Sequence, residues 1–120
     1  MVAQDGLAAS VAGGPSGPVI TLSGEIDLVS VAELNALLSG QLAGPTLQLT
    51  IDASDLRFAD TASIRALVLA ARTLNERGGR LVLLHPQPPV ARIMAVLGVE
   101  GMFTIRGKTA GEPGSEASAG

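Results

Sequence analysis

With 120 residues, the chain is long enough for one hydrophobic core but not for two. Its net charge of -3 disfavours a general nucleic-acid surface, and its two Phe, the only aromatic residues, argue against base stacking. The absence of cysteine excludes disulfides and thiolate sites and is compatible with a reducing cytoplasm. No apolar run reaches about 18 residues, so we expect a soluble cytoplasmic protein without direct membrane insertion.

The N-terminal part of the chain predicts two strands. A short first strand is expected near Gly6–Val11. The segment "AGGPSGP" (Ala12–Pro18) is typical of a turn or loop, and the β-rich "VITLS" (Val19–Ser23) then stops at a glycine. We therefore expect consecutive strands on either side of this segment.

A helix and a third strand are predicted next. The helix is expected near Val31–Ser39, with Ser30 and Glu33 spaced as a capping box and Gly40 placed as a C-terminal stop. In "TLQLTID" (Thr46–Asp52) apolar and polar residues alternate, which predicts a half-buried strand.

The second half of the chain begins with a strand-to-helix loop, Ala53–Asp60, and continues with two helices and two strands. A helix near Ala62–Arg77 has one apolar stripe, and a short strand, Arg80–Leu84, follows it. A further helix is expected near Val90–Leu97 and an edge strand near Met102–Ile105. The apolar stripe comprises Ile64, Leu67, Val68, Ala71 and Leu74. The crossover between the two central strands predicts that they are parallel neighbours.

The last residues differ in composition from the rest of the chain. The segment "GKTAGEPGSEASAG" (Gly107–Gly120) is small, polar and rich in Gly, Pro and Ser. Such a segment buries too little apolar surface to offset its ordering entropy, so we expect a disordered tail after one domain at residues 1–106.

The loop before the second helix is the first candidate site, because binding residues gather at the carboxyl ends of strands in α/β sheets. The carboxylates within it and directly before it, Asp52, Asp55 and Asp60, are compatible with acid–base chemistry or a hard metal ion, but Asx turns and helix capping explain them more simply. Thr61 leaves this loop. From the residues alone, the favoured interpretation of Thr61 is a helix N-cap rather than a modified side chain.

Catalysis is not predicted. His85 is the only histidine and has no nearby nucleophile or metal partner in the sequence, so we interpret it as a solvated residue at a strand end. No Walker-type loop and no G-x-G-x-x-G motif is present. We expect no metal ion and no cofactor.

Two segments resemble a known family when they are taken together. The segment "VITLSGEIDLVSVAEL" contains Gly24, Glu25, Ile26 and Asp27 before the first helix, and "LTIDASDLRFADTASIRALVLA" places Phe58 two residues before Asp60. In order and spacing these motifs resemble the STAS domain, specifically the bacterial anti-sigma factor antagonists, over about residues 5 to 106. The resemblance implies a mixed central sheet of four to five strands with helices mainly on one face.

The resemblance also implies a function. In such antagonists, the first hydroxyl after the loop Asp is phosphorylated by a partner anti-sigma factor of the serine/threonine kinase type. The unphosphorylated form binds that kinase and frees a sigma factor, and a phosphatase resets the switch. By position Asp60 matches the Asp and Thr61 the phosphoacceptor, with Ser63 as the alternative acceptor. The implied partner-binding residues are Asp27, Asp60, Thr61, Ala62, Ser63 and Arg65.

This sequence departs from the family pattern Asp-Ser-Ser/Thr-Gly-Leu-Gly. Thr61 replaces the usual Ser, and Ser63 and Arg65 replace the two glycines. Two further functions therefore stay open: a non-phosphorylated STAS adaptor in a signalling or transporter assembly, and a module that binds a small anion or nucleotide.

Overall fold

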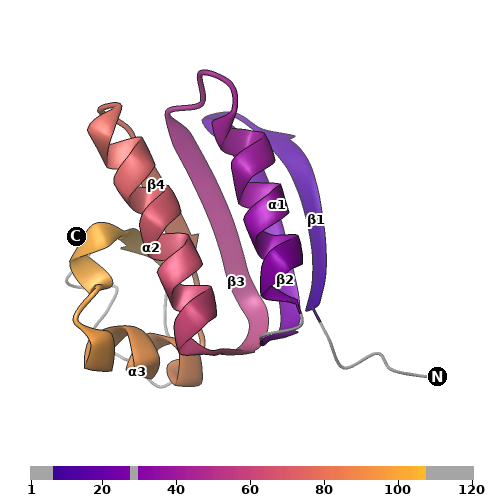
Figure 1. Cartoon of the computed structure of the whole chain (residues 1–120), viewed down its shortest axis with the longest axis vertical. Coiled ribbons are helices and arrows are strands. Elements are labelled where there is room, and N and C mark those ends of the chain that lie inside the picture. The colour runs from indigo at the N-terminus through magenta and orange to yellow at the C-terminus, as the bar shows by residue number, and fades with distance from the viewer. Residues whose placement is uncertain (1–6, 28–29, 108–120) are drawn as a thin grey trace.

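A five-stranded mixed sheet with the strand order β1-β2-β3-β4-β5 forms the centre of the structure (Figure 1). The computed structural model describes residues 7–27 and 30–107. The first two strands are antiparallel, and each later strand runs parallel to its neighbour. The strands are β1 (Leu7–Gly14), β2 (Gly17–Ile26), β3 (Gln48–Ala59), β4 (Arg80–Leu84) and β5 (Thr104–Arg106). The predicted mixed sheet and its parallel crossover are confirmed.

Two of the helices, α1 and α2, lie side by side across one face of this sheet (Figure 1). The third, α3, lies near β3, where the side-chain amide of Gln87 donates to the carbonyl oxygen of Ser54 at 2.5 Å. A short 3-10 turn joins α3 to the last strand. The helices are α1 (Val31–Leu42), α2 (Thr61–Glu76), α3 (Pro88–Leu97) and the 3-10 turn η1 (Glu100–Met102).

The core between the sheet and the helices is aliphatic, as the scarcity of aromatic residues predicts. Phe103 is the only aromatic side chain that it contains, and Phe58 is exposed. The apolar stripe of α2 is buried, except that Val68 is half-buried. The largest fully buried side chains of the core are Ile20, Leu22, Ile26, Leu34, Leu49, Ile51, Leu56, Ile64, Leu67, Leu74, Leu81 and Leu83.

The predicted loop at Ala53–Asp60 is wrong, because β3 continues to Ala59. Two register shifts against β2 each give β3 an extra residue, so its buried positions there fall three residues apart: Ala53, Leu56 and Ala59. A β-bulge shifts the alternation of faces in this way. The alternation of buried and exposed residues is therefore lost in this part of the sequence, although the strand does not end.

Two other boundaries also differ from the prediction. The turn expected over Ala12–Pro18 is only Pro15 and Ser16, because β1 and β2 extend as a hairpin on either side. The stop expected at Gly40 is wrong, since α1 continues to Leu42. A glycine in an exposed helix destabilises it by only about 1 kcal/mol relative to alanine, which is too little to end the helix.

The remaining predicted elements are confirmed within a few residues. The third helix begins two residues early, with prolines at its first positions, and ends at Gly98, whose φ of 70° is left-handed. The last strand is confirmed as a short edge strand. Of the predicted tail, only Gly107 falls within the described residues; the rest lies outside them.

Candidate functional site

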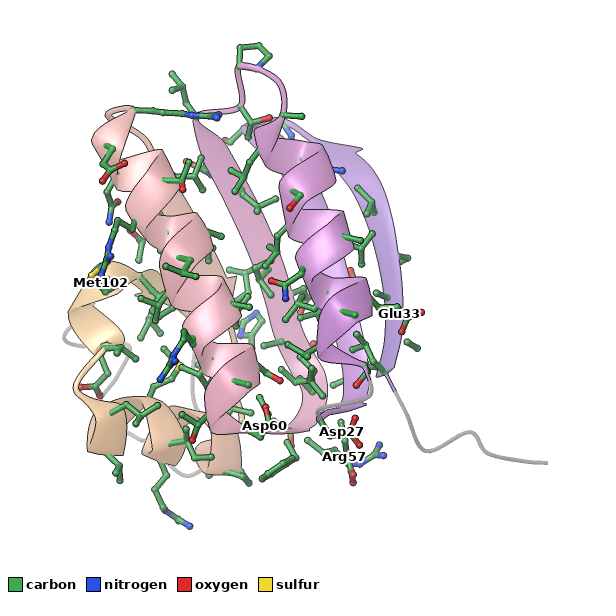
Figure 2. The ribbon with its side chains drawn as sticks, in the orientation of Figure 1. Asp27, Glu33, Arg57, Asp60 and Met102 are labelled. Carbon is green, nitrogen blue, oxygen red and sulfur yellow. The ribbon has the colours of Figure 1, made fainter. Side chains whose placement is uncertain are left out.

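The candidate site is formed where the parallel strands β2 and β3 end together. Ile26 pairs with Ala59, and the backbone N–H of Asp60 donates to the carbonyl oxygen of Ile26 at 3.2 Å. Asp27 and Asp60 therefore follow neighbouring strand ends and lie at the same end of the sheet, where α1 and α2 begin (Figure 2).

Asp60 caps the N-terminus of α2. Its backbone is extended (φ -83°, ψ 178°), and its Oδ1 accepts hydrogen bonds from the backbone N–H of Ser63 at 2.9 Å and the Ser63 hydroxyl at 2.7 Å. The interpretation of Thr61 as the N-cap is therefore wrong by one residue: Thr61 is already inside the helix. The predicted role of Asp60 in capping is confirmed.

A similar Asp-to-Ser hydrogen-bond pattern lies just before α1, whose N-cap is Ser30. Oδ1 of Asp27 accepts from the backbone N–H and the hydroxyl of Ser30, both at 3.1 Å, and the Ser30 Oγ accepts from the N–H of Asp27 at 3.0 Å. The predicted Ser30–Glu33 capping box is not formed, because the Ser30 side chain makes no cap hydrogen bond. A repeated D-x-x-S pattern, "DLVS" and "DTAS", was the sequence signal for both helix starts.

The two hydroxyls after Asp60 have opposite environments. Thr61 is exposed, whereas Ser63 has no solvent-accessible surface and its hydroxyl is bonded to Asp60. Ala62 and Arg65 are exposed. The strand ends thus bring together an accessible hydroxyl, the capping carboxylate of Asp60, the carboxylate of Asp27 and one arginine on the first turns of α2.

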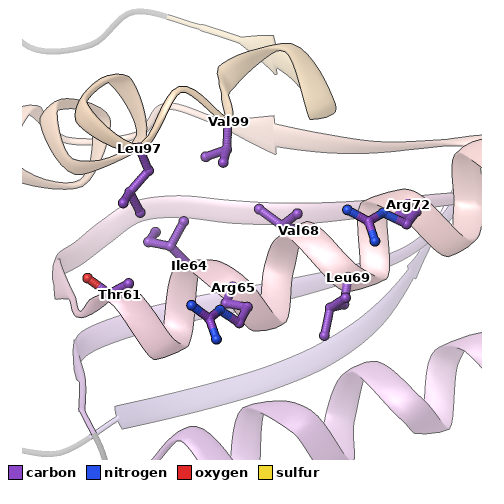
Figure 3. A pocket seen from close by; sticks show the side chains of 8 residues that line it. All are labelled: Thr61, Ile64, Arg65, Val68, Leu69, Arg72, Leu97 and Val99. Carbon is purple, nitrogen blue, oxygen red and sulfur yellow. The ribbon is translucent and has the colours of Figure 1, made fainter.

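A groove that the sequence did not reveal begins at Thr61. It has a volume of about 330 Å³ and runs between α2 and the segment that ends α3 (Figure 3). Its lining is mostly apolar, and its only charged side chains are two arginines. The lining residues are Thr61, Ile64, Arg65, Val68, Leu69, Arg72, Leu97 and Val99. The sequence signal for this groove was Leu69, an apolar residue that lies off the core stripe of the helix. In the structure, its side chain is 53% exposed.

The other candidate residues have structural roles or are exposed. Oδ1 of Asp52 accepts from the N–H of Ser54 at 3.1 Å and from its hydroxyl at 2.8 Å, so the Asx-turn interpretation is confirmed for this residue. Asp55 is exposed on β3. His85 is exposed at the end of β4, as predicted, and its backbone N–H donates to the carbonyl oxygen of Arg106 at 2.8 Å.

Within residues 7–27 and 30–107, no three His, Asp or Glu side chains gather in a way that could hold a metal ion. In the same ranges, no helix has the length and apolar character needed to cross a bilayer.

Replacing the capping carboxylate should destabilise the fold. In Asp60→Ala the N–H and the buried hydroxyl of Ser63 lose their acceptor. We therefore expect the free energy of unfolding to fall by about 2 kcal/mol, measured by urea denaturation. The exposed Asp55 is a matched control, and Asp55→Ala should change it by less than about 0.5 kcal/mol. Equal effects of the two variants would contradict the capping role of Asp60.

The sequence is similar to those of known proteins. A family model described as "Mlab, STAS domain" matches residues 9–106. The curated Bordetella bronchiseptica protein named "Putative anti-sigma factor antagonist BtrV" is 24% identical over 87 residues, which cover 72% of this chain and 75% of that protein.

Solved structures share the fold. An anti-sigma factor antagonist from Mycobacterium paratuberculosis superposes with a TM-score of 0.78 at 22% identity, covering 90% of this chain and 92% of the other. The antagonist SpoIIAA in its unphosphorylated form gives 0.72 at 23% identity, with 84% and 90% covered. The phosphorylated form of Bacillus SpoIIAA gives 0.67 at 21% identity, with 84% and 93% covered. With the family model matching most of its length, the chain belongs to the STAS domain family.

Proposed function

We propose that this protein is an anti-sigma factor antagonist that binds a kinase-type anti-sigma factor and frees a sigma factor, and that phosphorylation of Thr61 switches it off. The observation that carries the proposal is the exposed Thr61 hydroxyl, placed directly after the capping Asp60 at the rim where β2 and β3 end. A phosphatase would reset the switch.

The relatives support the class of function. The similar proteins are named as anti-sigma factor antagonists, and SpoIIAA has been solved in an unphosphorylated form and, from Bacillus, in a phosphorylated form. Antagonism works by binding a protein partner, so no catalytic residue is required of this chain.

The difference in exposure favours Thr61 over Ser63 as the acceptor. A kinase must bring the γ-phosphate of ATP in line with the attacking oxygen, and the reaction transfers that phosphoryl group to the hydroxyl and releases ADP. The Thr61 side chain is accessible for this approach. The Ser63 hydroxyl is buried and already donates to Asp60, so a kinase would have to open the first turn of α2 to reach it.

A phosphate on Thr61 would change the charge of this surface. A phosphate adds a charge of about -1.5 to -2 and three acceptor oxygens. At Thr61 it would stand beside the carboxylate of Asp60 and at the same end of the sheet as Asp27. An interface over Asp27, Asp60, Ala62 and Arg65 would then have to desolvate or pair this new charge, which weakens binding.

Substitutions at Thr61 test the proposal. With the cognate kinase and radiolabelled ATP, Thr61→Ala should lose phosphate incorporation while its affinity for the kinase stays near that of the wild type. Thr61→Glu should bind at least tenfold more weakly by calorimetry, a loss of about 1.4 kcal/mol or more, because the interface must desolvate the new carboxylate. Asn75→Glu, an equal charge change at an exposed position far along α2, is the control and should bind normally.

Other outcomes would change the assignment. A mass spectrum that places the phosphate on Ser63 would move the acceptor by two residues. If neither hydroxyl is modified while the protein still binds its partner tightly, the switch is excluded and the constitutive adaptor takes its place. A thermal shift with a nucleotide alone would instead favour the ligand-binding module.

A further inference from the structure

Arg65 lies one helical turn after Thr61 on the same face of α2. Residues four apart on a helix are neighbours, with Cβ atoms about 5–6 Å apart, and helical side chains point back toward the N-terminus. Figure 3 shows this arrangement: the Arg65 side chain extends toward the Thr61 end of α2, and both residues line the groove.

The guanidinium of Arg65 is available for a new partner. Within residues 7–27 and 30–107, it makes no hydrogen bond or ion pair, and the side chain is exposed. Arg77, by contrast, donates to the carbonyl oxygens of Leu42, Gly44 and Thr46. Arg72, the other cation of the groove, lies eleven residues after Thr61, which is about 16 Å along α2 at 1.5 Å per residue. Of the two groove cations, only Arg65 can reach a group attached to Thr61.

We propose that Arg65 binds the phosphate on Thr61 within the same chain, so that the modified side chain and the guanidinium form a pair across the mouth of the groove. This inference rests on the proposed phosphorylation of Thr61. The order is the favourable one for a helix, with the anion four residues before the cation. A guanidinium also presents two parallel N–H donors that match two phosphate oxygens.

The pairing changes what the groove offers to a partner. In the unmodified chain the groove has two cationic side chains and apolar walls. With phosphate on Thr61, Arg65 is held by an anion of its own chain, so a partner group that paired with Arg65 loses its contact. Phosphorylation thus removes a cation from the surface as well as adding an anion to it.

The pair can be measured without any kinase. Phosphothreonine is incorporated at position 61 of the full chain by an expanded genetic code, and the phosphate is titrated by ³¹P NMR. Replacing Arg65 by glutamine should raise the phosphate titration midpoint by about 0.3 pH unit, a twofold change in its protonation equilibrium. The neighbouring carboxylate of Asp60 raises the midpoint in every variant alike, so it cancels in the comparison.

Two further variants show whether the effect belongs to this pair. Arg72→Gln removes the same charge from the same helix and groove and should leave the midpoint unchanged, whereas Arg65→Lys should restore part of the shift. An equal response to the two glutamine variants would indicate general electrostatics and overturn the proposal. No response to Arg65→Gln would overturn it as well, even if a kinase does modify Thr61. If Arg65→Gln shifts the midpoint but no kinase modifies Thr61, the pairing stands and the proposed switch fails.

Discussion

Leu67→Ala is expected to lower the free energy of unfolding by about 2–5 kcal/mol. Leu67 is fully buried on the core side of α2. The substitution removes its transfer free energy and leaves a cavity that the packed aliphatic neighbours fill only in part. Equilibrium urea denaturation followed by circular dichroism measures the loss as a lower midpoint at an unchanged slope.

Leu69 provides the matched control on the same helix. It is 53% exposed and lies in the wall of the groove, so Leu69→Ala should change the free energy of unfolding by less than about 1 kcal/mol. Similar losses in the two variants would show that α2 does not present the face described here to the sheet.

The identity of most helices and strands could be predicted because aliphatic periodicity is a local property of the chain. The stripe that contains Ile64, Leu67 and Leu74 repeats at helical spacing, and all three are fully buried. Leu49 and Ile51 alternate with polar residues and are buried in β3. With few aromatic residues, these aliphatic side chains had to fill the core, so pattern and burial coincide.

The extension of β3 could not be predicted from alternation alone. Beyond Asp52 the buried residues Leu56 and Ala59 are three apart, because each register shift against β2 inserts a residue. Where a bulge forms depends on how the partner strand pairs, which is not encoded in the bulged segment itself. The consequence for the site is direct, since Thr61 follows a strand end rather than the exit of a loop.

The sequence placed the N-cap of α2 at the wrong residue, Thr61 instead of Asp60. Serine, threonine and aspartate are all good N-cap residues, so "ADTAS" allows more than one of them to cap the helix. Tertiary context decides: the N–H of Asp60 bonds to the end of β2, which holds Asp60 in the extended conformation that a cap needs. Ser63 is then directed into the protein and Thr61 outward.

The groove depends on contacts between distant parts of the chain. Leu97 and Val99 come from the end of α3 and the segment after it, far in sequence from Thr61 and Arg65. No local pattern predicts that these residues meet. What the sequence did show was a cation, Arg65, where the family pattern has a glycine.

Gly79→Ala is expected to lower the free energy of unfolding by about 3 kcal/mol. A Cβ at this position would collide with the backbone carbonyl of Leu47. That carbonyl cannot simply move away, because its oxygen accepts a hydrogen bond from the N–H of Arg80 at 2.8 Å. The N–H of Gly79 is held as well, by the carbonyl oxygen of Leu74 at 2.8 Å. Relief of the collision must therefore shift the start of β4 against β3.

Gly40→Ala separates this collision from the ordinary effect of adding a methyl group. Gly40 lies in the exposed part of α1, and a Cβ there would meet nothing within 4 Å. The substitution should raise the free energy of unfolding by about 0.5–1 kcal/mol, because alanine loses less conformational entropy in a helix. In both thermal and urea denaturation, the unfolding midpoint should thus fall in Gly79→Ala and rise in Gly40→Ala. If Gly79→Ala left the free energy of unfolding unchanged, the backbone at Leu47 would move aside at no cost in stability. The close contact with Leu47 would then not explain why glycine occupies the turn between α2 and β4.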